Sequence, residues 1–148
     1  MTFTQNGPEL KNQFTDDSLL QEYLKLKLPP QMIKEIFPHL QEVGVQVATE
    51  LMEWVKDAES NLPRLIPYDA WGNRIDEIQV SRGWQNLGVF AAENGLIASA
   101  YEKKYGEFSR FYQMALLYLF HPSSAIASCP LAMTDGAARA IELYGDED

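Results

Sequence analysis

The strongest helical pattern in the N-terminal half of the chain is residues 38–60, which read PHLQEVGVQVATELMEWVKDAES. Apolar side chains recur there at every third or fourth position: Leu40, Val43, Val47, Leu51, Trp54 and Ala58. Acidic and amide side chains lie between them, which is typical of a helix with one face in a core. Pro38 fixes a helical φ and lacks an N–H donor, so it suits the first position of a helix. We therefore predict one helix across 38–60.

The residues upstream predict a tail and a shorter helix. Residues 1–15 are polar and show no apolar period, so we expect a flexible tail. Residues 16–18, Asp-Asp-Ser, offer N-caps to a helix that ends at a pair of prolines, 29–30. A short helical turn is expected over 31–37.

The residues directly downstream, 63–82, break the helical period. A proline-interrupted segment is followed by turn residues, and Ile78 and Val80 then alternate with polar neighbours. This pattern predicts a small two-stranded hairpin in which Gly72 or Asn73 adopts a positive φ. Since an isolated hairpin is marginal in water, we expect it to pack against the helices.

Three more helical segments follow the hairpin. Small residues are frequent on the apolar face of 84–98, which predicts an internal helix. Residues 107–120 are apolar almost all round, which marks a central helix. After a break at the Cys-Pro pair of 129–130, Thr134 or Asp135 is expected to cap a last helix.

The predicted fold class is therefore mainly α: a bundle of about four to six helices with one small β-hairpin at about residues 63–82. Apart from the tail, we expect residues 16–145 to form a single helical domain. With 148 residues, of which 46% are hydrophobic, the chain can bury a core without disulfides or metals.

Composition excludes several classes of protein. The chain carries 12 basic and 21 acidic side chains, a formal net charge of −9, which disfavours binding to nucleic acid or to an anionic membrane. No apolar run is long enough to span a membrane, and the N-terminus resembles neither a secretory signal nor a transit peptide. A single cysteine, Cys129, cannot form an internal disulfide. We expect a cytoplasmic protein.

The side chains that commonly carry catalysis or bind metals are not grouped in this sequence. His39 and His121 have no second histidine or cysteine ligand at helical spacing, so we expect no metal site and a satisfied histidine at each position. His121 and Cys129 share no helical face, and we expect a small buried thiol rather than a nucleophile. Adjacent carboxylates, such as those of 16–17, 76–77 and 146–148, are expected to be caps and solvated charge. Neither glycine-rich phosphate-binding motif is present. We assign no catalytic residue.

Two segments leave alternatives open. Residues 68–74 place two aromatic side chains and a glycine on a turn, and residues 129–136 place a proline and polar caps after the most apolar helix. Each is explained structurally as a hairpin turn or a joint between helices. The alternative for the second segment is that it lines a cavity, because a helix N-terminus beside an apolar surface can receive an anionic or carbonyl ligand.

Two stretches in this order resemble the acyl-CoA dehydrogenase family, specifically its AidB-like branch. They are LPRLIPYDAWGNRIDEI at 62–78 and CPLAMTDGAA at 129–138, with a helix opening near Trp84 between them. The resemblance spans residues from about 35 to 145 and covers the N-terminal helical domain of that family only. The middle β-domain and the C-terminal helical domain are expected to be absent from this chain.

The resemblance implies an FAD-dependent flavoprotein of fatty acid metabolism. In that family a glutamate removes the α-proton of an acyl-CoA thioester while hydride passes to the flavin. No position here matches the glutamate, the flavin-contacting Met-Thr-Glu segment or the basic DNA-binding surface of AidB. The joint that follows Cys129 matches the part of the family that borders the acyl pocket. It makes Leu131, Met133 and Thr134 the candidate substrate-binding residues.

Three functions follow as hypotheses. The first is the N-terminal part of an acyl-CoA dehydrogenase-like oxidoreductase, which we expect neither to hold FAD nor to oxidise substrate by itself. The alternative is a non-enzymatic helical module that keeps the dehydrogenase scaffold and uses an exposed apolar face for self-association or for contact with further domains. The third is a carrier of acyl-CoA or a small lipid, which would bind an acyl chain without flavin.

Overall fold

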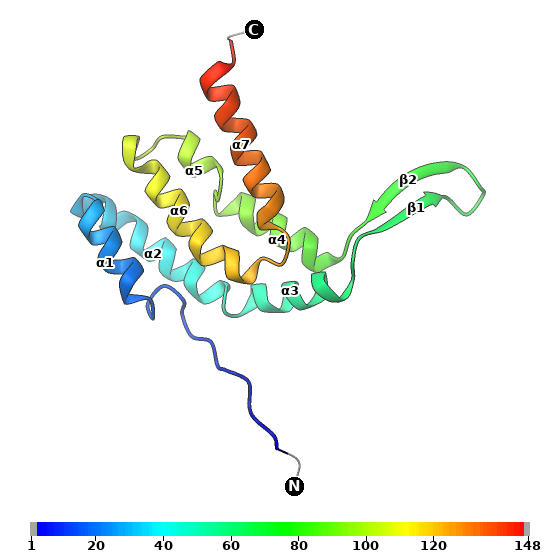
Figure 1. Cartoon of the computed structure of the whole chain (residues 1–148), viewed down its shortest axis with the longest axis horizontal. Coiled ribbons are helices and arrows are strands. Elements are labelled where there is room, and N and C mark those ends of the chain that lie inside the picture. The colour runs from blue at the N-terminus through cyan, green and yellow to red at the C-terminus, as the bar shows by residue number, and fades with distance from the viewer. Residues whose placement is uncertain (1–2, 147–148) are drawn as a thin grey trace.

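The computed structural model describes residues 3–146 and shows a helical body with two projecting elements (Figure 1). The chain forms α1 (Ser18–Lys27), α2 (Pro30–Gln46), α3 (Glu50–Ser60), β1 (Arg64–Tyr68), β2 (Arg74–Gln79), α4 (Arg82–Glu93), α5 (Ala98–Tyr101), α6 (Ser109–Phe120) and α7 (Ser128–Tyr144). Short 3-10 turns, η1 (Gly106–Phe108) and η2 (His121–Ser123), flank α6. The expected mainly α fold with one hairpin is confirmed. Residues 1–2 of the expected tail and 147–148 of the acidic C-terminal run lie outside the described residues.

The core lies where α2, α3, α4 and α6 pack together. Its most buried large side chains are at most 1% exposed and include Leu40, Val43, Val47, Leu51, Leu87, Leu116 and Phe120. Phe90 and Phe120 stack with ring centroids 5.8 Å apart and join α4 to α6. This apolar burial is the main source of stability for the helical body.

The predicted helix across 38–60 is wrong in its boundaries. The structure has two helices there, and Pro38 lies inside α2 rather than at its start. Pro38 is exposed, so the backbone hydrogen bond that it cannot make is lost on the solvent side of the helix. The break after α2 is a tight turn in which the Thr49 hydroxyl donates to the Val45 carbonyl at 2.9 Å. Val47 and Leu51 are both fully buried on either side of this turn, which is why the apolar period continues through it.

The predicted break at residues 129–130 is also wrong. α7 begins at Ser128 and runs through Pro130, which is its third residue. The first N–H groups of a helix have no partner inside the helix, so proline is tolerated at that position. Thr134 therefore lies within α7, where its hydroxyl donates to the Pro130 carbonyl at 2.9 Å instead of capping a helix.

The hairpin forms as predicted, but its expected packing is wrong. β1 and β2 pair antiparallel, with Leu65 opposite Ile78, and Gly72 at the turn has a φ of +84°. The carboxylate of Asp69 accepts the N–H groups of Trp71 and Asn73 and fixes the turn. Nearly every strand residue is exposed, and the hairpin extends away from the helices (Figure 1). Its order comes from its own ladder and turn.

The helix after the hairpin is shorter than expected. α4 ends at Glu93, and Gly95, with a φ of +61°, turns the chain before α5. At the other end, α4 approaches α3 closely enough that the Gly83 N–H donates to the Asp57 carboxylate at 2.6 Å. A side chain at position 83 would have its Cβ 3.0 Å from the Asp57 Cβ, so only glycine fits this contact.

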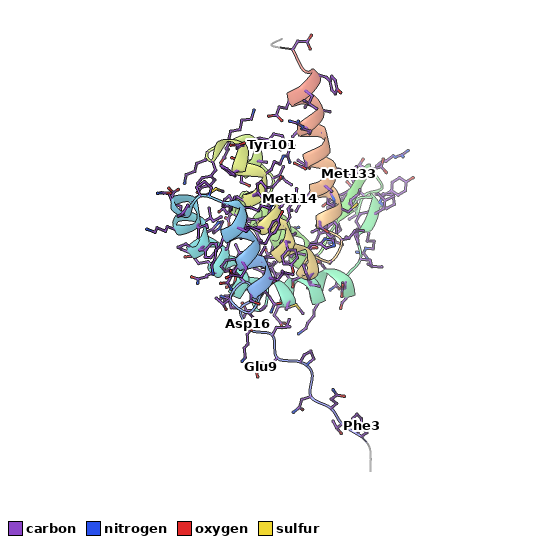
Figure 2. The ribbon with its side chains drawn as sticks, turned by 60° about the vertical axis from the view of Figure 1, so that its left-hand side comes forward. Phe3, Glu9, Asp16, Tyr101, Met114 and Met133 are labelled. Atoms are coloured by element: carbon purple, nitrogen blue, oxygen red, sulfur yellow. The ribbon has the colours of Figure 1, made fainter. Side chains whose placement is uncertain are left out.

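The N-terminal segment is anchored at its end. Residues 3–11 are exposed and extend away from the body, as Phe3 and Glu9 show (Figure 2). Phe14, however, is 1% exposed and meets Phe37 edge to face. The Asn12 amide also donates to the Gln41 carbonyl at 3.0 Å. The expected tail through residue 15 therefore differs from the structure, since its last residues pack on α2.

Candidate functional site

The candidate acyl-binding residues lie beside a small hollow between α4 and α7. The hollow has a volume of about 180 Å³ and is lined mostly by apolar side chains: Trp84, Leu87, Gly88, Ala91, Ala127, Pro130, Leu131 and Thr134. Leu131 and Thr134 face it from α7, one turn apart. Met133 is 71% exposed and does not line the hollow (Figure 2). The structure thus brings two of the three predicted residues together.

Local sequence explains how α4 forms its side of the hollow. The Ser81 hydroxyl caps the helix by accepting the Trp84 N–H at 3.2 Å. Gly88 lies in the wall of the hollow, and a Cβ built there would have no neighbour within 4 Å. The absent side chain at position 88 therefore leaves the hollow open.

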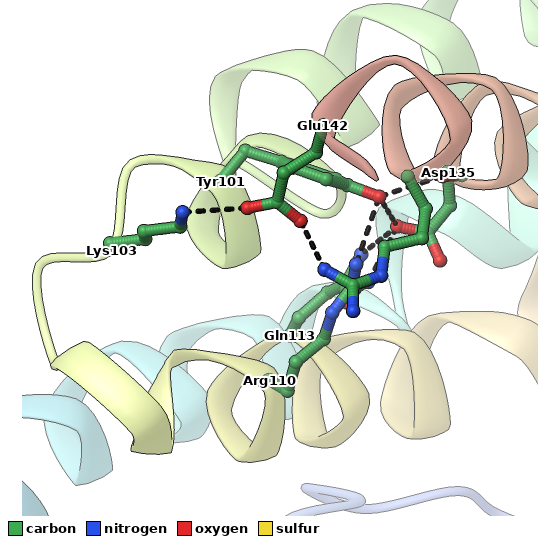
Figure 3. Close-up of polar contacts among 7 residues, drawn as sticks. Tyr101, Lys103, Arg110, Gln113, Asp135 and Glu142 are labelled. Atoms are coloured by element: carbon green, nitrogen blue, oxygen red, sulfur yellow. Dashed lines mark hydrogen bonds and ion pairs between the residues drawn. The ribbon is translucent and has the colours of Figure 1, made fainter. Parts of the chain in front are cut away.

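A polar cluster connects α7 to α5 and α6 (Figure 3). One carboxylate oxygen of Asp135 accepts hydrogen bonds from Arg110 at 2.7 Å and from the Gln113 amide at 3.0 Å. The Tyr101 hydroxyl lies 2.8 Å from the same oxygen and 2.6 Å from the Asp135 carbonyl. Arg110 in turn donates to Tyr101 at 2.9 Å and lies over its ring. Asp135 therefore joins α7 to both α5 and α6.

The protonation of this cluster follows from its contacts. Partial burial raises the pKa of Asp135, but the hydrogen bonds from Gln113, Arg110 and Tyr101 outweigh it and lower the pKa below its ordinary value. The hydrogen bond to Asp135 raises the pKa of Arg110 further. Asp135 is therefore ionised at neutral pH and has no proton to give to a reaction.

A groove larger than this hollow lies elsewhere, between α1 and α6. It has a volume of about 550 Å³ and is lined by Leu19, Leu20, Tyr23, Leu24, Arg110, Phe111, Met114, Ala115 and Tyr118. Sequence reasoning missed this groove because it treated the apolar residues of α1 as core and α6 as covered all round. Leu19 is 78% and Met114 51% exposed, so both helices keep an apolar face toward solvent.

Both histidines are satisfied, as predicted. The Nε2 of His39 lies 2.8 Å from the Asn94 side-chain oxygen, and its Nδ1 contacts the Tyr112 hydroxyl. If Nε2 carries the proton, the imidazole donates to Asn94 and accepts from Tyr112. Burial, with a smaller effect of Tyr105, raises the pKa of Tyr112 to about 12. The His121 Nδ1 lies 2.9 Å from the Ser128 hydroxyl.

The cysteine prediction is wrong, because Cys129 is exposed rather than buried. It occupies the first turn of α7, where its side chain does not enter the hollow. His121 contacts Ser128 and not Cys129, so the two do not form a nucleophile and base.

Residues 3–146 contain no group of three or more histidine, cysteine or carboxylate side chains that could hold a metal ion. The hollow offers one hydroxyl, that of Thr134, and its proton already goes to Pro130. The diphosphate of FAD needs cations or a row of backbone N–H groups, and this lining supplies neither. The residues that line this hollow do not fit a flavin on their own.

In residues 3–146, none of the helices from α1 to α7 is both long enough and apolar enough to cross a bilayer.

Comparison with known proteins shows which family the chain is related to. The family model of the "Adaptive response protein AidB N-terminal domain" matches residues 6–146. "Acyl-CoA dehydrogenase family member 11" of Caenorhabditis elegans is 38% identical over 147 residues, which is 97% of this chain and 24% of that protein.

Among solved structures, "Bd2924 apo-form" is similar with a TM-score of 0.93 and 53% sequence identity, over 99% of this chain and 29% of that chain. The chain thus spans about a quarter of the curated relative and less than a third of the solved structure. Both the family match and the structural similarity extend over nearly all of the described residues. The chain therefore belongs to the AidB N-terminal domain family, the helical N-terminal domain of AidB-like acyl-CoA dehydrogenases.

Proposed function

We propose that this chain supplies one apolar wall of an acyl pocket in an FAD-dependent acyl-CoA dehydrogenase, and that it does not oxidise substrate by itself. The observation that carries the proposal is the hollow between α4 and α7, with Leu131 and Thr134 in its lining. Pockets that bind a whole small-molecule ligand typically measure about 300–1,000 Å³. At about 180 Å³ this hollow is too small to hold a whole ligand, so we propose that it forms one side of a larger pocket.

The chemistry of the lining supports a binding role rather than a catalytic one. Removal of an α-proton needs a base within hydrogen-bond reach of the substrate. The hollow is lined by apolar side chains and one threonine, and Asp135, the nearest carboxylate along α7, is held by three donors. The residues of this chain can exclude water from an acyl tail and orient it. FAD and the catalytic glutamate of the family belong, in this proposal, to other parts of the whole protein.

Two measurements on the purified chain test this proposal. We expect no FAD to copurify with the protein and no reduction of an electron acceptor when acyl-CoA is added. Stoichiometric bound FAD together with acyl-CoA-dependent reduction would show that the chain is a complete enzyme and would refute the proposal.

A second candidate function is a helical interaction module, as the exposed apolar side chains favour it. On α7, Met133 is 71%, Ile141 70% and Tyr144 84% exposed. On the hairpin, Leu65 is 58% and Trp71 86% exposed. Large contiguous apolar patches on a surface commonly mark protein contacts. Light scattering across a range of concentrations tests the module, and a clean monomer at high concentration would count against self-association.

A third candidate, an acyl carrier, is tested by calorimetry. Tight binding of an acyl-CoA without flavin would favour it, whereas no heat of binding would remove it. The exposed free thiol of Cys129 suits a reducing compartment, and we propose the cytoplasm as the location.

A further inference from the structure

The helix α7 has little apolar packing to hold it in place. None of its 17 residues is buried, and the helix extends well beyond the helical body (Figure 1). Near the start of the helix, Leu131 packs against the core. Most helices in proteins are stabilised by packing an apolar face, so α7 needs another means of keeping its direction.

The polar cluster at Asp135 holds α7 in its direction (Figure 3). Gln113 is 0% exposed, and its side-chain amide donates a hydrogen bond to the Asp135 carboxylate. One partner of the carboxylate is therefore fixed in the core of the bundle. Arg110 bridges Gln113, Asp135 and Tyr101 through its two terminal nitrogens. The carboxylate is held from two elements, α5 and α6, so both the position and the rotation of α7 are restricted at this point.

We propose that Asp135 is the positioning residue of the α4–α7 hollow: its contacts with Tyr101, Arg110 and Gln113 set the direction of α7 and thereby the place of Leu131 and Thr134. The part of this inference that concerns acyl binding rests on the proposed function. Its structural content, the control of α7 by Asp135, stands apart from any ligand. Thr134 directly precedes Asp135 in the sequence, so rotation of α7 about its axis moves both together.

A second polar contact on α7 serves as the internal comparison. Glu142 pairs with Lys103 at 2.6 Å and also contacts Arg139. The Glu142 side chain is 23% exposed, much like that of Asp135, but its partner Lys103 is 63% exposed against 37% for Arg110, and the Arg139 contact lies within α7 itself. Exposed ion pairs are screened by solvent and contribute little to structure. The direction of α7 therefore depends on Asp135 and not on Glu142.

Distances between two spin labels, measured by double electron–electron resonance, test the proposal on the full chain. Cys129 is the only cysteine, so Cys129→Ser leaves a background for labels at Gln85→Cys on α4 and Ala140→Cys on α7, both exposed positions. Circular dichroism and the urea midpoint of each variant report helicity and stability of the bundle separately. In the parent protein we expect one narrow distance distribution.

Asp135→Ala removes the three hydrogen bonds of the carboxylate and keeps a residue that favours helix, while the Tyr101 hydroxyl can still donate to the backbone carbonyl of residue 135. We expect the distance distribution to broaden and shift with helicity unchanged, and Tyr101→Phe to have a smaller effect in the same direction. Glu142→Ala, the matched control on the same helix, should leave the distribution narrow.

An unchanged distribution in Asp135→Ala would overturn the proposal, as would equal broadening in Glu142→Ala. If Asp135→Ala does not fold, Tyr101→Phe against Glu142→Ala gives the same decision. Since the distances are measured without ligand, they test the control of α7 by Asp135 separately from the proposed function, which is tested by FAD content and acyl-CoA oxidation.

Discussion

The close approach of α4 to α3 at Gly83 makes a sharp prediction about stability. A Cβ at this position would lie 2.8 Å from the Asp57 carboxylate and 3.0 Å from its Cβ, and it would also overlap the Trp54 carbonyl oxygen. Because one of these atoms is backbone, the clash is not relieved by rotating a side chain. Gly83→Ala must push α4 away from α3 and weaken the Gly83 N–H bond to Asp57.

The magnitude follows from two opposing effects. Overpacking costs about 1–3 kcal/mol, and the backbone partner puts this site near 3 kcal/mol. Alanine is favoured over glycine in a helix by about 1 kcal/mol, which offsets part of the cost. The net loss is about 2 kcal/mol, which corresponds to a fall in Tm of roughly 6 °C at about 3 °C per kcal/mol for a domain of this size.

Gly88→Ala is the matched control on the same helix. A Cβ at position 88 meets nothing within 4 Å, so only the helix preference acts and stability should rise by about 1 kcal/mol. Urea unfolding followed by circular dichroism measures both variants. Equal stabilisation of the two would show that α3 and α4 are not in contact at Gly83 and would refute this reasoning.

Three further predictions concern single side chains. The pKa of Asp135 is lower in the folded protein than in the unfolded chain. The ionised carboxylate therefore stabilises the fold fully above the pKa of the unfolded chain, and this stabilisation is lost as the pH falls through the pKa of the folded protein. The difference in urea midpoint between the parent and Asp135→Ala should shrink below about pH 4. Phe14→Ala should cost about 3–5 kcal/mol in urea unfolding, whereas Phe3→Ala, at a residue 90% exposed, should change stability little. Spectrophotometric titration should show one tyrosine ionising near pH 12, and Tyr112→Phe should remove that step.

The helical class and the hairpin could be predicted because both depend on local pattern. Apolar residues at three- and four-residue steps define α2, α3, α4 and α6, and Gly72 supplies the positive φ that the hairpin turn requires. Boundaries were harder to predict. The turn after α2 keeps Val47 and Leu51 in phase, so nothing in the apolar period marks it.

Two prolines misled the prediction for the same physical reason. Proline removes one N–H group and its ring crowds the carbonyl four residues earlier, and the loss of the N–H costs least where that group would have had no buried partner. Pro38 lies on the solvent side of α2, and Pro130 lies in the first turn of α7. Neither position interrupts its helix, so a proline by itself does not fix where a helix begins or ends.

The candidate site was only partly predictable. Leu131 and Thr134 were named through a family resemblance, and the hollow that they line depends on the side chain that Gly88 lacks in another helix. The cluster around Asp135 joins residues 22 to 34 positions apart. Contacts of this kind arise from tertiary packing, and no local period indicates them.

The central claim is that the α4–α7 hollow receives an acyl chain. NMR titration with acyl-pantetheine thioesters tests it most directly, since these lack the nucleotide phosphates that a chain of charge −9 would repel. Gly88→Leu should fill the hollow, and Val89→Leu, next to it and 54% exposed, is the control.

We predict shifts of the Leu131 and Thr134 methyl signals that grow with acyl length, are absent with pantetheine alone, are lost in Gly88→Leu and persist in Val89→Leu. Shifts confined to the α1–α6 groove, at Leu20 and Met114, or no shift at any acyl length, would contradict the account.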